Sequence, residues 1–226
     1  MDKINIAIDG PAGAGKSTVA KKVADYLRYI YIDTGAMYRA LTWKAIQEKL
    51  DLNSDEQLSK RLHQMKIDLQ PSPQGQKVFV DGEEVTDQIR QRDVTNQVST
   101  VATHYKVREG MLLLQRELAE NKGIVMDGRD IATHVLPDAE VKIFLSASIE
   151  MRAKRRFLEF QAKGVEHDLE QLKKEISLRD QQDSEREIAP LRKAPDAIEI
   201  DSSNLSIDEV VEKILQMVNE SKKRSN

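Results

Sequence analysis

The sequence predicts an α/β fold, a doubly wound parallel sheet of five strands with helices on both faces. Short apolar runs alternate with longer segments of helical periodicity, and a glycine-rich loop directly follows the first run. Apolar runs without polar alternation are typical of parallel strands covered on both faces. The runs expected to be strands are Ile4–Ile8, Ile30–Ile32, Ile124–Met126, Val141–Leu145 and Ala197–Ile200.

Helical segments separate these strands, as in doubly wound folds. In the last segment Ser206 and Glu209 form a capping box, and Leu205 with Val210 forms a hydrophobic staple. We expect the residues from 221 to 226 to be a frayed tail. The predicted helices are Lys16–Leu27, Ala36–Lys49, Val94–Glu120, Ile149–Lys163, Leu169–Arg186 and Ile207–Glu220.

One segment, from Lys66 to Val85, interrupts the alternation of strands and helices. It contains short β-like runs, a turn at Pro71–Gly75, and an Asp81-Gly82 pair that is typical of a tight hairpin. A short helix capped at Ser54 precedes it. The sequence therefore predicts a small antiparallel β insert in the main fold.

Composition restricts the classes of protein. The 226 residues suit one domain, hydrophobic residues make up 39% and charged residues 32%, and no run approaches the length of a membrane span. The chain has no cysteine, which excludes disulfides and thiolate metal sites and favours a cytoplasmic location; we expect no signal peptide. A net charge of -3 argues against a general nucleic-acid binder. The four histidines lack metal-ligand spacing.

The glycine-rich loop after the first strand has the pattern of an ATP-binding phosphate loop. Its glycines let backbone N–H groups approach phosphate oxygens, and Lys16 is placed to contact the β- and γ-phosphates. The Ser17 hydroxyl is placed to bind Mg²⁺, and Thr18 starts a helix. The predicted ATP-binding residues here are Gly10, Pro11, Ala12, Gly13, Ala14, Gly15, Lys16, Ser17 and Thr18.

The loop alone does not distinguish a kinase from a GTPase or an ATP-driven machine. A guanine-recognising Asn-Lys-x-Asp motif is absent, since Asn121-Lys122-Gly123-Ile124 lacks the aspartate. The chain is short for a motor ATPase and has no long acidic run. A small-molecule kinase fits best.

Arginine-bearing motifs follow two further strands. Asp33–Arg39 and Asp127–Asp130 both lie at the carboxyl edge of the predicted sheet, where α/β proteins bind ligands. Further arginines occur on two later helices. Their spacing fits either a solvated face or a lid that closes over phosphates. These residues are Arg152, Arg155, Arg156, Arg179, Asp183 and Arg186.

Over essentially its full length the chain resembles the bacterial cytidylate kinases, of the nucleoside monophosphate kinase group. The phosphate loop with Ile6–Asp9 before it, the Asp33–Arg39 run and the Asp127–Asp130 motif carry the resemblance. Further matches are Val141–Leu145, Arg179-Asp180 with Asp183 and Arg186, Ala189-Pro190-Leu191, Asp201-Ser202 and the β insert. One departure is Ala132, followed by Thr133-His134, where the family commonly has glycine.

The resemblance implies transfer of the ATP γ-phosphoryl group to CMP or dCMP, with Mg²⁺, by a monomer. It implies a core (about 1–33, 106–147 and 188–226), a monophosphate-binding insert (about 34–105) and a lid (about 148–187). Lys16, Arg129 and Arg186 would be catalytic, and Arg156 would contact ATP from a lid that also holds Arg152 and Arg155. CMP would be bound through Thr34, Tyr38, Arg39, Arg129 and Arg186 at the phosphate, Ser99, Arg108 and Asp130 at the base, and Arg179 and Asp183 at the sugar.

The chemistry of cytosine agrees with this assignment. Its amino group suits an acceptor such as Asp130, whereas the uracil carbonyl at that position would be repelled. A monophosphate has a second pKa of about 6, so no general base is required. Two alternatives remain: a related kinase acting on another monophosphate or on a small alcohol such as shikimate, and a regulatory module that binds ATP without transferring phosphate.

Overall fold

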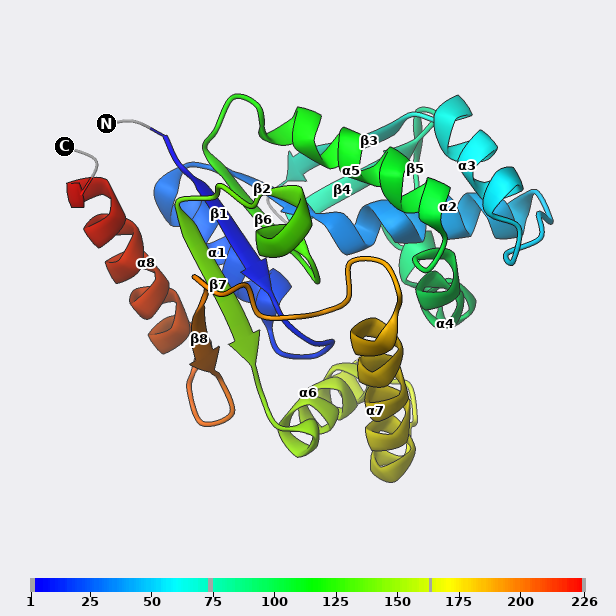
Figure 1. Cartoon of the computed structure of the whole chain (residues 1–226). Coiled ribbons are helices and arrows are strands. Elements are labelled where there is room, and N and C mark those ends of the chain that lie inside the picture. Colours follow the sequence, from blue (N-terminus) through cyan, green and yellow to red (C-terminus); the bar gives the residue numbers. More distant parts are fainter. Residues whose placement is uncertain (1–2, 73–74, 163, 225–226) are drawn as a thin grey trace.

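A parallel five-stranded sheet forms the centre of the molecule (Figure 1). The computed structural model describes residues 3–72, 75–162 and 164–224. The strand order is β2-β6-β1-β7-β8, and every neighbouring pair is parallel. The predicted fold class is confirmed. The strands are β1 (Asn5–Asp9), β2 (Ile30–Asp33), β6 (Ile124–Gly128), β7 (Val141–Ser146) and β8 (Ile198–Asp201).

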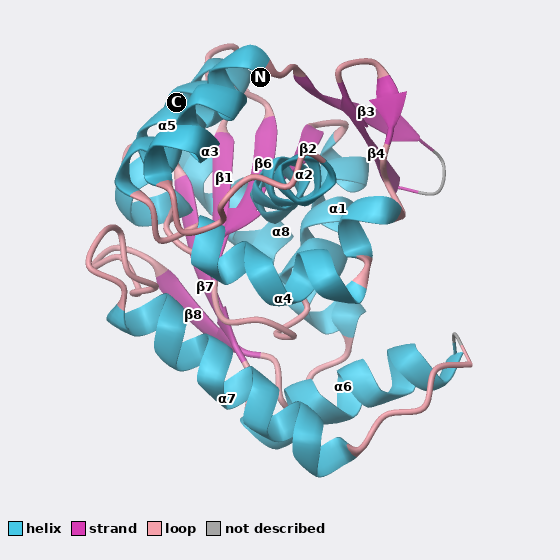
Figure 2. Ribbon diagram, turned by 90° about the vertical axis from the view of Figure 1, so that its right-hand side faces the viewer, coloured by secondary structure: helices cyan, strands magenta, loops and turns pink. Residues whose placement is uncertain are grey.

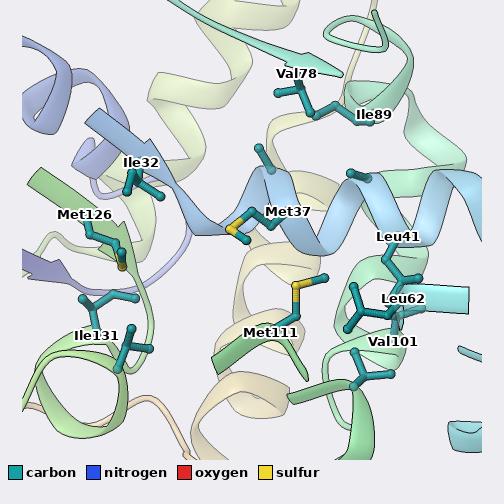
Figure 3. Packing of buried hydrophobic residues seen from close by; sticks show 14 of the residues in the cluster. Ile32, Met37, Leu41, Leu62, Val78, Ile89, Val101, Met111, Met126 and Ile131 are labelled. Carbon is teal, nitrogen blue, oxygen red and sulfur yellow. The ribbon is translucent and has the colours of Figure 1, made fainter. Parts of the chain in front are cut away.

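Each face of the sheet is covered by its own hydrophobic core. Helices α1 (Lys16–Leu27) and α8 (Ile207–Arg224) cover one face, and α2 (Thr34–Gln47) and α5 (Tyr105–Ala119) cover the other. Because successive strand residues point to opposite faces, Val125 packs in the first core and Met126 in the second. Figure 3 shows Met126 near Ile32 and Ile131 in the second core. This two-sided burial explains the continuous apolar runs.

The predicted insert is a three-stranded antiparallel sheet, at the upper right of Figure 2. It contains β3 (Ile67–Ser72), β4 (Gly75–Val80) and β5 (Glu83–Glu84), and follows α3 (Asp55–Gln64), which Ser54 caps as predicted. Asp81 and Gly82 both have positive φ, 52° and 89°, as a tight hairpin requires. Of the turn expected at 71–75, Pro71 and Ser72 belong to β3 instead, and Pro73 and Gln74 lie outside the described residues.

The prediction of a single helix from Val94 to Glu120 is wrong, because two helices occupy this segment. A 3-10 turn (Gln88–Arg90) leads into α4 (Arg92–Val101), and α5 begins separately at Tyr105. His104, in extended conformation, donates from Nε2 to Leu52 O at 2.8 Å. Asp55 of α3 accepts hydrogen bonds from the backbone N–H groups of Lys106 and Val107, which start α5. These long-range contacts cap the N-terminus of α5, so α5 is a helix separate from α4.

Helices α6 (Ile149–Ala162) and α7 (Leu169–Glu185) pack against each other below the sheet in Figure 1. They have a small core of their own around Ala153, Leu172 and Ile176. Lys163, the expected end of the first helix, lies outside the described residues. Among the described helices, none combines the length and the apolar character that crossing a membrane requires.

The last helix begins as predicted and ends later. Ser206 N–H donates to Glu209 Oε2 at 2.8 Å, and Glu209 N–H donates to Ser206 Oγ at 3.2 Å, which confirms the capping box. Leu205 packs in the same core as Val210. The expected frayed tail is wrong for residues 221–224, because α8 continues to Arg224; residues 225 and 226 lie outside the described part of the chain.

Candidate active site

The phosphate loop connects β1 to α1, as its sequence predicted. Gly10, Gly13 and Gly15 have φ values of 148°, 78° and 93°, in the region that favours glycine. At Gly10 a Cβ atom would lie 2.0 Å from the backbone oxygen of Leu145 in β7. The loop can therefore follow this path only with glycine at position 10.

Lys16 lies inside the loop, with 5% of its surface exposed. Its ammonium group donates to Pro11 O at 2.8 Å. Burial, followed by the nearby Arg129 charge, lowers the pKa of Lys16 to about 7. An anion bound in the loop would stabilise the charged form of this side chain.

Oxygen groups suited to a magnesium complex lie beside the loop. Ser17 Oγ donates to Asp127 Oδ2 at 3.0 Å, and Tyr31 OH donates to Asp127 Oδ1 at 2.7 Å. Burial, and then the nearby Asp33 carboxylate, raise the pKa of Asp127 to about 6. Within the described residues, no cluster of three His, Asp or Glu side chains is arranged to hold a metal alone. The donors fit Mg²⁺ that arrives with a nucleotide, since Mg²⁺ prefers oxygen ligands and substrate phosphates.

A cavity of about 230 Å³ lies next to Lys16 and Ser17, between the strand ends and helices α2, α4, α5, α6 and α7. All residues predicted to bind the second substrate line it, although they come from segments far apart in the sequence. They are Thr34, Tyr38, Arg39, Ser99, Arg108, Arg129, Asp130, Arg179, Asp183 and Arg186, and Arg156 is with them.

Two ion-pair groups organise the walls of this cavity. Arg129 Nε donates to Asp183 Oδ2 at 2.7 Å, which connects the end of β6 to α7. Asp130 accepts from Arg108 at 2.5 Å and from Arg186 at 3.2 Å. Burial raises the pKa of Asp183, but Arg129 and Arg179 lower it more, so it lies below its usual value. Both carboxylates thus hold arginines on the cavity wall.

Arginine donors without partners point to an anionic ligand. In the described part of the chain, the buried Nε atoms of Arg39, Arg108 and Arg179 have no hydrogen-bond partner, and all three residues line the cavity. Burial, followed by the Arg129 charge, lowers the pKa of Arg179 to about 10. Buried donors are normally paired, so these groups fit a ligand rich in acceptor oxygens.

Helix α2 begins at the cavity with an acidic cap. Asp33 Oδ1 accepts from the backbone N–H of Ala36 at 2.8 Å, and Asp33 Oδ2 accepts from Arg39 at 2.9 Å. Thr34 Oγ1 donates to the backbone oxygen of Asp127 at 2.7 Å. The starts of α2 and of the Asp127–Asp130 motif are therefore directly connected.

A second, larger cavity of about 670 Å³ lies on the other side of the loop. Residues 13 to 18 line it together with Arg155, Arg156 and the start of α8. Arg155 donates to Ala14 O at 3.2 Å and to Ser202 O at 2.6 Å. Arg156 lines both cavities, so it faces the space on each side of the loop.

Three predicted residues line neither of these two cavities. Gly10 and Pro11 lie in the loop, where Pro11 O accepts from Lys16. Arg152 is buried, with 4% exposed, and pairs with Asp180 at 2.6 Å while donating to Ala12 O at 3.1 Å. Arg152 thus joins α6, α7 and the outer side of the loop.

Three acidic residues of the site have no role predicted from the sequence. Asp9, Asp33 and Asp127 are each the last or second-last residue of a core strand, and all are buried. Charged residues that end apolar strands at the carboxyl edge are the signal that would have identified them.

With groups suited to phosphates on both sides of Lys16, the fold and the site define a P-loop kinase, a phosphotransferase. A sequence model of the cytidylate kinases matches residues 6–220. The chain belongs to the cytidylate kinase family. It is 62% identical to a cytidylate kinase of Anoxybacillus flavithermus and 61% identical to that of Geobacillus kaustophilus, each over 96% of this chain and 97% of the relative.

Solved structures share the fold at low identity. A shikimate kinase from Bacteroides thetaiotaomicron has a TM-score of 0.50 at 12% identity, with 96% of this chain and 99% of that chain covered. A gluconokinase from Sinorhizobium meliloti 1021 has a TM-score of 0.50 at 14% identity, with 99% and 96% covered. These likenesses concern the arrangement of the elements alone.

Proposed function

We propose that this protein transfers the γ-phosphoryl group of ATP to CMP and dCMP, forming CDP or dCDP and ADP. The single observation that supports this most strongly is the set of unpartnered buried arginine donors beside the phosphate loop. They supply positive charge for an acceptor that is itself anionic. Family membership supplies the identity of that acceptor.

The acceptor phosphate would bind Thr34, Tyr38, Arg39, Arg129 and Arg186. Arg129 and Arg39 are both held by carboxylates, Asp183 and Asp33, with remaining donors available to a ligand. Of these five residues we assign catalytic roles to Arg129 and Arg186, together with Lys16. Each would stabilise negative charge on the transferring group.

Cytosine would be recognised by Ser99, Arg108 and Asp130, and Asp130 also contacts Arg186 of the phosphate site. The Arg108–Asp130 pair presents a donor next to an acceptor, which matches N3 and the amino group of cytosine. Uracil would place a carbonyl oxygen against Asp130. Arg179 and Asp183 would contact the sugar hydroxyls. CMP and dCMP would therefore differ only in the contact that these two residues make with the sugar.

ATP would lie along the larger cavity, with its phosphates in the loop of residues 10–18 and Arg156 across them. Ser17 would hold Mg²⁺, with Asp127 next to it. The ion supplies charge neutralisation for the phosphates when it is bound. The acceptor phosphate is largely dianionic at neutral pH, so no general base is required. The chain's residues position the two substrates, exclude water and stabilise the charge on the transferring group.

The architecture suggests three functional parts. We assign residues of about 1–33, 106–147 and 188–226 to a core, 34–105 to a monophosphate-binding insert, and 148–187 to a lid. Arg156 is the lid residue that would approach ATP, while Arg152 and Arg155 would keep α6 on the loop. We further propose that the protein acts as a monomer in the cytoplasm.

A panel of acceptors with ATP and Mg²⁺ tests the proposal by coupled ADP release. CMP and dCMP should be phosphorylated efficiently, and UMP, AMP, GMP and shikimate should be poor acceptors. Rapid turnover of a small alcohol would establish the alternative kinase activity. ATP binding without ADP release for any acceptor would establish a non-catalytic module.

A further inference from the structure

Asp9 is a buried acid for which the proposed reaction has no role. It is the last residue of β1, directly before the phosphate loop, and 1% of its surface is exposed. Its carboxylate contacts the segment that follows the neighbouring strand β6. Asp9 Oδ1 accepts from Ile131 N–H at 2.9 Å, and Asp9 Oδ2 accepts from Ala132 N–H at 2.8 Å.

Burying a carboxylate at this position carries a desolvation cost that an apolar side chain would avoid. Burial raises the pKa of Asp9 to about 7, although the two N–H donors and Lys16 act in the opposite direction. An apolar side chain would avoid this desolvation but would leave two buried N–H groups unpaired. The carboxylate therefore serves to hold the backbone at residues 131 and 132.

The residue directly before these two amides is Asp130. Its backbone, with φ of -142° and ψ of 26°, belongs to no regular element, and its carbonyl accepts from His134 N–H and Val135 N–H. Its carboxylate is bound by Arg108 and Arg186. Asp9 thus fixes the main chain of Asp130 from one side while the arginines fix its side chain from the other.

We propose that Asp9 is a positioning residue for cytosine recognition, which sets the place of the Asp130 carboxylate relative to the phosphate loop. The inference rests on the proposed function of Asp130. Because Asp9 immediately precedes Gly10, one residue connects the loop that would bind ATP with the residue that would recognise the base. We expect a shift of residues 130–132 to change base selectivity more strongly than it changes ATP binding.

The test is the ratio of kcat/KM for CMP to that for UMP in Asp9→Asn. Asparagine keeps one acceptor but turns its NH₂ toward a backbone N–H, so the segment should move. We expect the ratio to fall about 10-fold or more, with a raised KM for CMP and a KM for ATP close to the wild-type value. Asp81→Asn is the matched control, because Asp81 also accepts from a backbone N–H, that of Lys66 at 2.8 Å, and lines neither of the two cavities.

A double-mutant cycle separates this inference from the proposed function. If Asp9 acts through Asp130, adding Asp9→Asn to Asp130→Asn should leave the CMP/UMP ratio unchanged. A further fall in the double variant, or a wild-type ratio in Asp9→Asn alone, would overturn the inference. A wild-type enzyme without CMP preference, or an Asp130→Asn variant with an unaltered ratio, would instead contradict the proposed function.

Two measurements cover the case in which Asp9→Asn does not fold. Asp9→Ser removes the carboxylate and is expected to lower the same ratio. In the wild-type protein, hydrogen exchange of the Ile131 and Ala132 amides should be strongly protected although neither belongs to a strand. Exchange of these amides at the rate of an open loop would overturn the inference.

Discussion

Arg129 Nε lies 2.7 Å from Asp183 Oδ2, and both side chains line the cavity beside Lys16. The pair joins the end of β6 in the core to α7 in the proposed lid. One carboxylate therefore holds a proposed catalytic arginine before any substrate is present. Such preorganisation lowers the reorganisation required in the transition state.

Asp183→Asn should release Arg129 from its position. We expect kcat/KM for CMP to fall about 10- to 100-fold, with KM for ATP little changed, because the donor groups for ATP lie on the other side of the loop. Steady-state kinetics with each substrate varied in turn measures this. The control is Asp196→Asn, which removes the pair between the exposed Asp196 carboxylate and Lys142 and should behave as wild type. Equal losses in the two variants would contradict the assignment.

Lys16→Met should abolish most activity without unfolding the protein. Removing the ammonium group takes away charge stabilisation of the transferring phosphoryl group, which is worth about 10²- to 10³-fold in kcat. The free protein is relieved of a buried charge but loses the hydrogen bond from Lys16 to Pro11 O, so its thermal midpoint should change little. Turnover is followed by ADP release and the fold by circular dichroism. A variant with near-normal kcat would show that Lys16 is not the phosphate ligand.

ATP binding should take up protons above neutral pH. Burial lowers the pKa of Lys16 to about 7 in the free protein, so the side chain is largely neutral at pH 8. Bound phosphates favour the charged form and raise this pKa, so binding takes up approximately one proton and weakens as the pH rises above 7.

Calorimetry in buffers of different ionisation enthalpy measures this proton uptake. Lys16→Met is the control and should show no uptake at the same pH. Wild-type binding at pH 8 without any dependence on the buffer would mean that Lys16 is already charged in the free protein.

Gly10→Ala should disrupt the phosphate loop. The added Cβ would lie 2.0 Å from the backbone oxygen of Leu145, so β7 or the loop must move, at a cost of about 1–3 kcal/mol or more. Gly82→Ala is the control, since that glycine also has positive φ but no atom within 4 Å of the new Cβ. Chemical denaturation of both variants compares the losses. A smaller loss at Gly10 than at Gly82 would contradict the packing argument.

Much of the core fold could be predicted because its signals are local. The apolar strand Ile4–Ile8 and the glycine pattern after it each depend on a few consecutive residues. The break between α4 and α5 could not be predicted in this way. It depends on Asp55 and Leu52, about 50 residues earlier in the chain, which contact the start of α5.

In the site, too, features with local sequence signals could be predicted and features that depend on long-range packing could not. Arg129 and Asp130 were identified because they follow a strand at the edge where parallel sheets bind ligands. Arg152 and Arg156 lie one helical turn apart, and the sequence does not separate them. Packing does, since Asp180 and the loop carbonyl of Ala12 bind Arg152, while Arg156 faces both cavities.

The central claim is that the acceptor is a cytidine monophosphate recognised through Asp130. The most direct measurement is a competition in one vessel, in which equal concentrations of CMP and UMP share limiting enzyme with ATP and Mg²⁺. The ratio of CDP to UDP formed early in the reaction gives the ratio of the two kcat/KM values. We predict CDP in large excess, with the excess much reduced in Asp130→Asn; equal formation of CDP and UDP by the wild-type protein would contradict the account.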